Sequence, residues 1–300
     1  MNSKKINIGV IGSGHLGQHH VKHYKSMNNI NFLGLHDINP ERGGEIAKKY
    51  ETKYFENVFN LMEACDGISI VTPTESHYDV AKIALNEFGC NVFIEKPITE
   101  TISQADDLID HAQKNNLIIQ VGHIERLNPA LKALEKYDIT PKFIDIQRLA
   151  PYTVRGTDVP VVLDLMIHDI DILLSLVKSK VKSIHASGVS ILTNSVDIAH
   201  ARIRFENGTV SSVTASRVAK DKVRKIKIFQ DNLYSTIDLL LEQTEVYNIT
   251  KDPNLIENAL QAEPFPIDNE KKYIVYEKPK IKNYDSLLEE LNNFVNSILK

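Results

Sequence analysis

The feature that most constrains the fold is a glycine-rich loop near the N-terminus. Gly12-Ser13-Gly14-His15-Leu16-Gly17 has the pattern G-x-G-x-x-G, between an apolar segment at 6–11 and a helical pattern at 15–26. Asp37 ends the next apolar segment. In this context the glycines allow a tight turn, close approach of a pyrophosphate and close packing of the helix, whose N-terminus stabilises phosphate charge. The loop and Asp37 therefore predict a dinucleotide site.

Asp37 also predicts which dinucleotide binds. A carboxylate at this position accepts hydrogen bonds from the ribose hydroxyls of NAD and repels the 2′-phosphate of NADP. We therefore expect NAD, with nearby Arg42 as the residue that could offset this preference.

The pattern of apolar segments predicts two domains in the 300 residues. In residues 1–122, expected strands near 6–11, 30–36, 67–71, 91–95 and 117–121 alternate with helices near 15–26, 40–50, 58–64, 77–87 and 103–115. This alternation predicts an α/β Rossmann domain with a doubly wound parallel sheet.

Residues 123–300 have a different pattern. We expect helices near 129–136, 161–177 and 284–300, and strands near 142–149, 184–190, 198–205, 209–215, 225–230 and 234–239. Successive strands joined by short turns, such as Glu206-Asn207-Gly208-Thr209, predict an α+β domain with a large open, mostly antiparallel sheet. We assign substrate binding and oligomerisation to this domain. The exposed sheet face predicts a homodimer or homotetramer.

Charge and composition exclude several classes of partner. With 35 basic and 39 acidic side chains, the chain has no basic excess for nucleic acid. Charged residues interrupt its most apolar later stretch, at 159–177, so no membrane association is expected. Cys65 and Cys90 form neither a metal spacing nor a disulfide framework, and no signal-peptide pattern is present. We therefore expect a cytoplasmic protein.

The first expected helix carries a cluster of histidines, His15, His19, His20 and His23. Those at 15, 19 and 23 lie on one face, a spacing that can bind metal. No carboxylate or cysteine completes the set, so we expect no metal. We expect the first turn to face the cofactor and the later histidines to be solvated.

Two further segments carry ionisable groups where chemistry is expected. Glu95-Lys96-Pro97 ends an expected strand, and ligands bind at the carboxyl ends of parallel strands. A surface lysine in a turn is the alternative. In the apolar helix 161–177, Asp164, His168 and Asp171 share one face. Such a polar stripe is costly unless hydrogen-bonded, so it indicates either a reactive site or a structural network.

Taken together, these motifs resemble the Gfo/Idh/MocA family of oxidoreductases. The resemblance rests on the glycine-rich loop, on Thr72-Pro73-Thr74 with His77, on Glu95-Lys96-Pro97, and on the D-x-x-x-H of Asp164 and His168. It implies that Lys96, Asp164 and His168 are catalytic. It also implies that Thr72, Pro73, Thr74, His77, Glu95 and Lys96 contribute to the cofactor pocket.

A narrower resemblance concerns two segments. Residues 121–130, Val-Gly-His-Ile-Glu-Arg-Leu-Asn-Pro-Ala, are similar to the V-G-H-x-E-R-F-N-P-A of sugar-nucleotide 3-dehydrogenases, with leucine for phenylalanine. Residues 164–171 are similar to their D-L-x-x-H-D-I-D. These enzymes oxidise the 3-hydroxyl of UDP-N-acetylglucosamine for the amino sugar of lipid A, which implies this or a related nucleotide sugar as substrate. Family members usually continue past the Phe294 region with a further helix, so both a naturally short and a truncated chain remain open.

Roles within the site follow from the chemistry of alcohol oxidation. Histidine has an ordinary pKa of about 6.5, which makes His168 the expected base. Lys96 would stabilise the developing alkoxide or share the base role, and Asp164 would position one of them. Candidates for binding the substrate diphosphate are Arg126, Asn128, Arg148 and Arg155, although surface solvation is the simpler interpretation of any single arginine. Asn128 also fits a helix N-cap.

Two other functions stay open from the sequence. One is a dehydrogenase of a free sugar, inositol or another polyol. The other is a non-catalytic NAD-sensing protein, which the presence of Lys96, Asp164 and His168 argues against.

Overall fold

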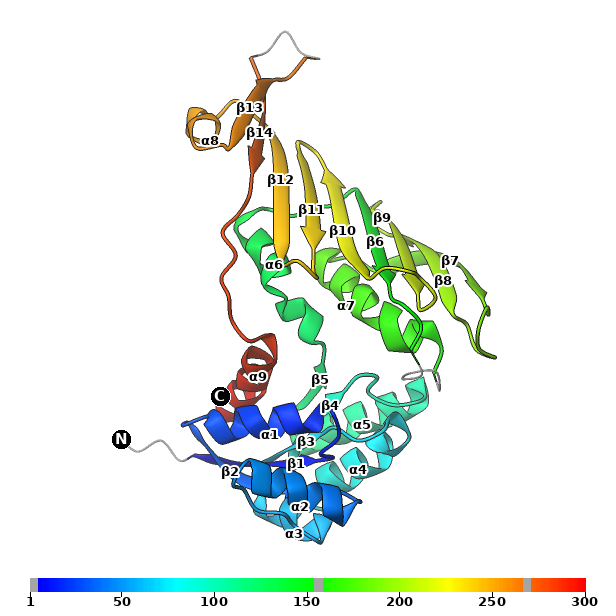
Figure 1. Cartoon of the computed structure of the whole chain (residues 1–300), viewed down its shortest axis with the longest axis vertical. Helices are drawn as coiled ribbons and strands as arrows, with labels where there is room; N and C mark the ends of the chain where they lie inside the picture. The colour runs from blue at the N-terminus through cyan, green and yellow to red at the C-terminus, as the bar shows by residue number, and fades with distance from the viewer. Residues whose placement is uncertain (1–4, 154–158, 267–270) are drawn as a thin grey trace. The chain divides into compact units, whose positions relative to one another are not determined.

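A computed structural model describes residues 5–153, 159–266 and 271–300 (Figure 1). Arg155, a predicted substrate-binding residue, lies outside the described residues. The chain divides into two compact units. The first holds the residues up to Ile124 together with Asp285–Lys300, and the second holds Glu125–Tyr284.

The first unit contains a parallel sheet with strand order β2-β1-β3-β4-β5. Its strands are β1 Ile6–Ile11, β2 Ile30–His36, β3 Gly67–Ile70, β4 Asn91–Glu95 and β5 Ile119–Gly122. Its helices are α1 Gly17–Ser26, α2 Pro40–Lys49, α3 Val58–Ala64, α4 Thr74–Asn86, α5 Ile102–Asn115 and α9 Ser286–Leu299. The predicted Rossmann domain is confirmed. The order reverses beside β1, the point where open parallel sheets bind nucleotides.

Packing on both faces explains the apolar character of the central strands. Ile8, Ile68 and Ile94 are fully buried, as expected where helices cover both sides of a parallel sheet. α9 contributes to this core. Leu291 and Phe294 on α9 are fully buried in the same cluster as Ile8. The expected second domain, 123–300, included these residues, whereas their apolar face packs within the first unit.

The second unit is built on a mixed sheet with strand order β13-β14-β12-β11-β10-β6-β9-β8-β7. β6 and β9 pair in parallel, and the other neighbours among the described strands pair antiparallel. The strands are β6 Phe143–Leu149, β7 Val181–Val189, β8 Ile198–Phe205, β9 Val210–Ser216, β10 Val223–Gln230, β11 Leu233–Asp238, β12 Gln243–Thr250, β13 Gln261–Pro264 and β14 Tyr273–Glu277. The predicted large, mostly antiparallel sheet is confirmed.

Helical segments cover one face of this sheet, where α6 and α7 lie (Figure 1). They are α6 Pro129–Lys132, η2 Ala133–Lys136, η3 Val162–Met166 and α7 Ile167–Leu176. The short η1 Ile124–Leu127 precedes α6, and the short α8 Pro253–Glu257 follows β12. On β8 the residues alternate, with Ala199, Ala201 and Ile203 buried and Arg202 exposed. The second sheet face is therefore open, as predicted for an antiparallel sheet with one covered face.

The apolar helix predicted at 161–177 differs from the expected regular α-helix. Its first part, η3, is a π-helix, and α7 continues from Ile167. Single π-turns inside helices are frequent at functional sites, because the wider turn re-aims side chains. Within the described residues, no helix is both long and apolar enough to cross a bilayer.

Candidate active site

The glycine-rich loop connects β1 to α1, and its geometry accounts for each glycine. Gly12 has a φ of 91°, and a Cβ there would lie 2.5 Å from the Val71 carbonyl oxygen. A Cβ on Gly17 would lie 2.0 Å from the Gly12 oxygen. Around Gly14, in contrast, nothing lies within 4 Å of the position of a Cβ. Gly12 and Gly17 are thus required by the fold, and Gly14 leaves the space that a pyrophosphate needs.

Asp37, at the end of β2, is bonded to this loop. Its Oδ2 accepts hydrogen bonds of 2.6 Å from both the backbone N–H and the hydroxyl of Ser13, and Oδ1 accepts one from Asn39 N. Burial alone would raise the pKa of Asp37, but these hydrogen bonds and nearby Arg42 outweigh it and lower that pKa. Arg42 Nε donates to the Ser13 carbonyl, so Arg42 also braces the loop.

A cavity of about 620 Å³ opens beside these residues. Of the predicted cofactor residues, Gly12, Gly14, Asp37, Thr72 and Pro73 line it. Sequence reasoning missed Ile38, which also lines it and is 95% exposed. An exposed apolar side chain next to the acid that we expect to bind the ribose fits an adenine ring. The signal for it in the sequence was its position directly after Asp37. The residues present fit a bound NAD.

Two predicted cofactor residues take supporting positions. His77 is buried, and its ring nitrogens lie 2.9 Å from the carbonyl oxygens of Thr72 and Pro97. It therefore ties the segments that follow β3 and β4. Ser13, within the loop, is fully buried, and its hydroxyl donates a hydrogen bond to Asp37.

Lys96 follows β4, at the carboxyl edge of the parallel sheet. Its backbone N–H donates to Glu95 Oε2 at 3.3 Å, and Glu95 Oε1 lies 3.2 Å from His20 Nε2 on α1. The prediction that the later histidines of α1 are solvated is wrong, since His20 and His23 are buried. They pack inward because α1 lies on the sheet and against α9. In the described part of the chain, no group of three or more His, Cys, Asp or Glu residues could hold a metal ion.

In the second unit, Asp164 lies on η3 and His168 on α7, and both are partly buried. The third member of the predicted stripe, Asp171, is buried and accepts a forked pair of hydrogen bonds from Arg126. Asp171 is thus part of an ion pair between α7 and η1. The structure brings Asp164 and His168 together on one helix, while Lys96 belongs to the first unit.

Arg148, a predicted substrate-binding residue, is 2% exposed. Its Nε lies 2.9 Å from both carboxylate oxygens of Asp169, and its Nη1 lies 3.3 Å from Glu125 Oε1. Arg224 Nη1 donates to the same Glu125 oxygen at 2.8 Å. This geometry favours a structural role for Arg148 beneath α7 over contact with a substrate.

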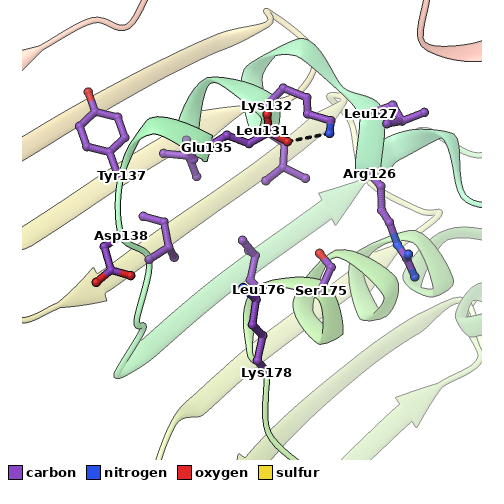
Figure 2. A pocket seen from close by; sticks show the side chains of 12 residues that line it. Arg126, Leu127, Leu131, Lys132, Glu135, Tyr137, Asp138, Ser175, Leu176 and Lys178 are labelled. Carbon is purple, nitrogen blue, oxygen red and sulfur yellow. Dashed lines mark hydrogen bonds and ion pairs between the residues drawn. The ribbon is translucent and has the colours of Figure 1, made fainter. Parts of the chain in front are cut away.

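Arg126 and Asn128 follow β5 in the chain. The Asn128 side chain caps α6 by accepting from Ala130 N and donates to the Leu239 carbonyl, so the N-cap interpretation is confirmed. The Arg126 side chain is 53% exposed. It lines a cavity of about 470 Å³ together with Leu127, Lys132, Tyr137, Ser175 and Lys178 (Figure 2). Two of the arginines predicted to bind a diphosphate, Arg126 and Arg148, lie within the described residues. Of these two, Arg126 has the solvent-exposed side chain.

Comparisons with known proteins agree with this geometry. Residues 6–123 match the oxidoreductase family with an NAD-binding Rossmann fold, and residues 150–232 match the GFO/IDH/MocA C-terminal domain. The chain is 37% identical over 244 residues to UDP-N-acetylglucosamine 3-dehydrogenase of Acidithiobacillus ferrooxidans, covering 81% of this chain and 77% of that protein. A solved structure of that enzyme superposes with a TM-score of 0.86 over 98% of this chain and 89% of that chain.

More distant relatives have other substrates in their names. The chain is 27% identical over 235 residues to scyllo-inositol 2-dehydrogenase (NAD(+)) of Bacillus subtilis, covering 72% of this chain and 68% of that protein. A levoglucosan dehydrogenase solved with NADH and levoglucosan is 18% identical, with a TM-score of 0.80 over 99% of this chain and 90% of that one. At that identity, the likeness shows the fold alone.

Proposed function

The chain belongs to the Gfo/Idh/MocA family of oxidoreductases, and from this premise we propose that it oxidises the 3-hydroxyl of UDP-N-acetylglucosamine or a related nucleotide sugar. The observation that carries this proposal is the 37% identity over 244 residues to an enzyme named for that reaction. The NAD-binding Rossmann domain supplies the cofactor site. The reaction belongs to amino-sugar synthesis for lipid A, in the cytoplasm.

In the proposed mechanism, Lys96, Asp164 and His168 act on one substrate hydroxyl. Bound NAD supplies the hydride acceptor. His168 removes the hydroxyl proton, because an imidazole accepts a proton near neutral pH. Lys96 donates a hydrogen bond to the same oxygen and stabilises its developing negative charge, or shares the proton. Asp164, one helical turn before His168, orients these groups.

Arg126 is the residue we propose for the substrate diphosphate. Its side chain is 53% exposed, and its guanidinium donates a forked pair of hydrogen bonds to Asp171. An arginine held in this way is oriented before a phosphate arrives, which lowers the entropic cost of binding. Asn128 and Arg148 have contacts that support structural roles, as described above.

The second candidate function is oxidation of a free polyol, which the inositol dehydrogenases among the relatives favour. NADH formation should be measured with UDP-N-acetylglucosamine, other UDP-sugars, inositols and free sugars. Turnover that is fastest with a UDP-sugar supports the proposal. Turnover with inositol and none with UDP-sugars would leave the site in place and overturn the substrate assignment.

A variant of Arg126 tests the proposed diphosphate contact directly. In Arg126→Lys, the charge stays but the forked geometry is lost, so KM for a UDP-sugar should rise roughly tenfold, about one good charged hydrogen bond. KM for a free polyol should change little. An equal change in KM for both substrates would contradict a role for Arg126 in binding the diphosphate.

We also propose that the protein is a homodimer or homotetramer that assembles through the open face of the second unit's sheet. Five aromatic side chains form a stripe across five neighbouring strands of that face, namely Phe143, Phe229, Tyr234, Tyr247 and Tyr276. Successive ring centroids lie 4.8–5.8 Å apart. A continuous aromatic stripe on a solvent-facing sheet is typical of an interface.

A further inference from the structure

A chain of buried polar side chains runs from α1 to the residue that precedes Lys96. His20 on α1 is fully buried, with Nε2 3.2 Å from Glu95 Oε1 and Nδ1 3.4 Å from the Ser69 hydroxyl. The Ser69 oxygen lies 2.9 Å from the Tyr24 hydroxyl, and both residues are fully buried. The chain of contacts is therefore Tyr24–Ser69–His20–Glu95, with residues from α1, β3 and β4.

Hydrogen-bond chemistry gives this chain one direction when the His20 imidazole is neutral. A carboxylate only accepts, so His20 Nε2 carries the proton toward Glu95. In the neutral imidazole, Nδ1 then accepts from the Ser69 O–H, and Ser69 accepts from the Tyr24 O–H. Burial raises the pKa of Tyr24, against the smaller opposing effect of its hydrogen bond to Ser69, so its phenol stays protonated as a donor. One histidine tautomer thus satisfies every member.

The other end of the chain fixes the Glu95 carboxylate beside Lys96. Glu95 Oε2 accepts from the backbone N–H of Lys96 at 3.3 Å. Gly122 on β5 lies against the carboxylate, since a Cβ there would come within 2.9 Å of Glu95 Oε1. The ring of His20 packs edge-on against Phe93, with centroids 5.3 Å apart. The carboxylate is held by its neighbours on several sides, and each of its two oxygens has a hydrogen-bond partner in the first unit.

We propose that Glu95 is a positioning residue for Lys96, held by the chain Tyr24–Ser69–His20, rather than a residue that contacts the cofactor. α1 is the helix whose N-terminus follows the glycine-rich loop, so the chain joins the phosphate-binding helix to the start of the catalytic-lysine segment. Its effect is to hold the Lys96 backbone in one place. The inference rests on the proposed function of Lys96.

The test uses Glu95→Gln, which keeps the shape and removes the charge. With UDP-N-acetylglucosamine as substrate, kcat should fall by roughly ten- to a hundredfold, the range known for outer-shell partners in metal sites. The Kd for NAD and the melting temperature should stay close to those of the wild type, since both carboxylate oxygens already have partners within the first unit. Unchanged kcat, or weaker NAD binding with unchanged kcat, would overturn the proposal.

His20 provides a conservative pair of variants. His20→Gln keeps a donor for Glu95, whereas His20→Phe fills the space without one, so Gln should retain more of the wild-type kcat than Phe. His19→Gln, one residue earlier on α1 and outside the chain, is the matched control and should behave as the wild type. Equal kcat in His20→Gln and His20→Phe would contradict a role for the hydrogen bond.

Two further variants keep the proposal testable if Glu95→Gln does not fold or if Lys96 is not catalytic. If Glu95→Gln does not fold, Tyr24→Phe removes only the terminal hydroxyl, and it should lower kcat severalfold without changing the Kd for NAD. An unchanged kcat in Tyr24→Phe would then overturn the proposal. Lys96→Met distinguishes failure of the proposed function from failure of the positioning role of Glu95. Normal turnover in Lys96→Met would refute the proposed function itself, while a large loss there with normal Glu95→Gln would refute the positioning role alone.

Discussion

At the residue scale, Asp37 is the residue that we expect to set the preference for NAD over NADP. In the structure its carboxylate accepts hydrogen bonds from Ser13, and Asp37 lines the cavity beside the glycine-rich loop. Asp37→Ala should narrow the difference between NAD and NADP affinity, because it removes both the ribose hydrogen bonds and the repulsion of a 2′-phosphate. Isothermal titration with each dinucleotide measures this. If the wild type binds NADP as tightly as NAD, Asp37 does not discriminate.

The same carboxylate makes stability depend on pH. Hydrogen bonds from Ser13 and Asn39 hold the folded pKa of Asp37 below its ordinary value, against burial. Its stabilising contribution is therefore complete above the unfolded pKa, about 3.9, and is lost as the pH falls through the lower folded value. Melting temperatures of wild type and Asp37→Asn should differ at neutral pH and converge in acid. A constant difference down to low pH would contradict this.

Lys96 and His168 are predicted to work as a unit. Lys96→Met and His168→Ala should each lower kcat by roughly a hundred- to ten-thousandfold, the usual contribution of a general acid or base. The double variant should be little worse than either single variant, because both groups serve one proton transfer. Steady-state kinetics with the best substrate measure this, and NAD affinity should stay nearly unchanged. Additive losses would place the two residues in separate steps.

Single residues also show what sequence could and could not predict. Gly12, Gly14 and Asp37 were predictable because a strand, a loop and a helix adjacent in sequence define their roles. The burial of His20 was not, because its partner Glu95 is distant in sequence and meets it only in the folded sheet. Arg148 was misleading for the same reason, since an arginine in a strand gives no sign that Asp169 and Glu125 enclose it.

Among the elements, α9 is the one whose position the sequence did not predict. A helix at 284–300 was predicted, but a sequence pattern does not identify the surface on which the apolar face of a helix packs. In the structure Phe294 lies edge-on to Phe93 on β4 with centroids 5.9 Å apart, and Glu290 accepts from His123 N. The π-turn of η3 was equally hidden, because the apolar run at 161–177 fits a regular α-helix as well.

This packing predicts that α9 stabilises the cofactor-binding unit. Phe294→Ala should cost about 3–5 kcal/mol of unfolding free energy, the range for a fully buried phenylalanine, because it leaves a cavity against β4. Urea denaturation followed by circular dichroism measures the loss. Ile109→Ala, on the half-exposed side of α5, is the control and should change stability little. A loss below 1 kcal/mol in Phe294→Ala would show that α9 is dispensable for this unit.

At the scale of the whole molecule, most strands of the second unit's sheet were predictable from the sequence, but the edge strand β13 was not. Apolar residues alternate with polar ones in β6 and in the strands from β8 to β11, because each of these strands has one face on the core. β7, at one edge of the sheet, is exposed along nearly all of its length. β13, Gln-Ala-Glu-Pro, is exposed along its length and has no such alternation. The same alternation that buries Ile144 and Ile228 turns Phe143 and Phe229 to the opposite face.

The aromatic stripe on that face leads to the last prediction. Its five rings are aligned because the strands pair in a register that sets Phe229 opposite both Phe143 and Tyr234, and Tyr247 opposite Tyr234 and Tyr276. Leaving this stripe in water is unfavourable, so a second copy should cover it. Light scattering should give the mass of a dimer or tetramer for the wild type. Tyr247→Lys puts a charge in the middle of the stripe and should shift the protein toward monomer, whereas Ile109→Lys, on the first unit, should keep the wild-type mass. A wild type that is monomeric at micromolar concentration, or a Tyr247→Lys variant with unchanged mass, would refute assembly through this face.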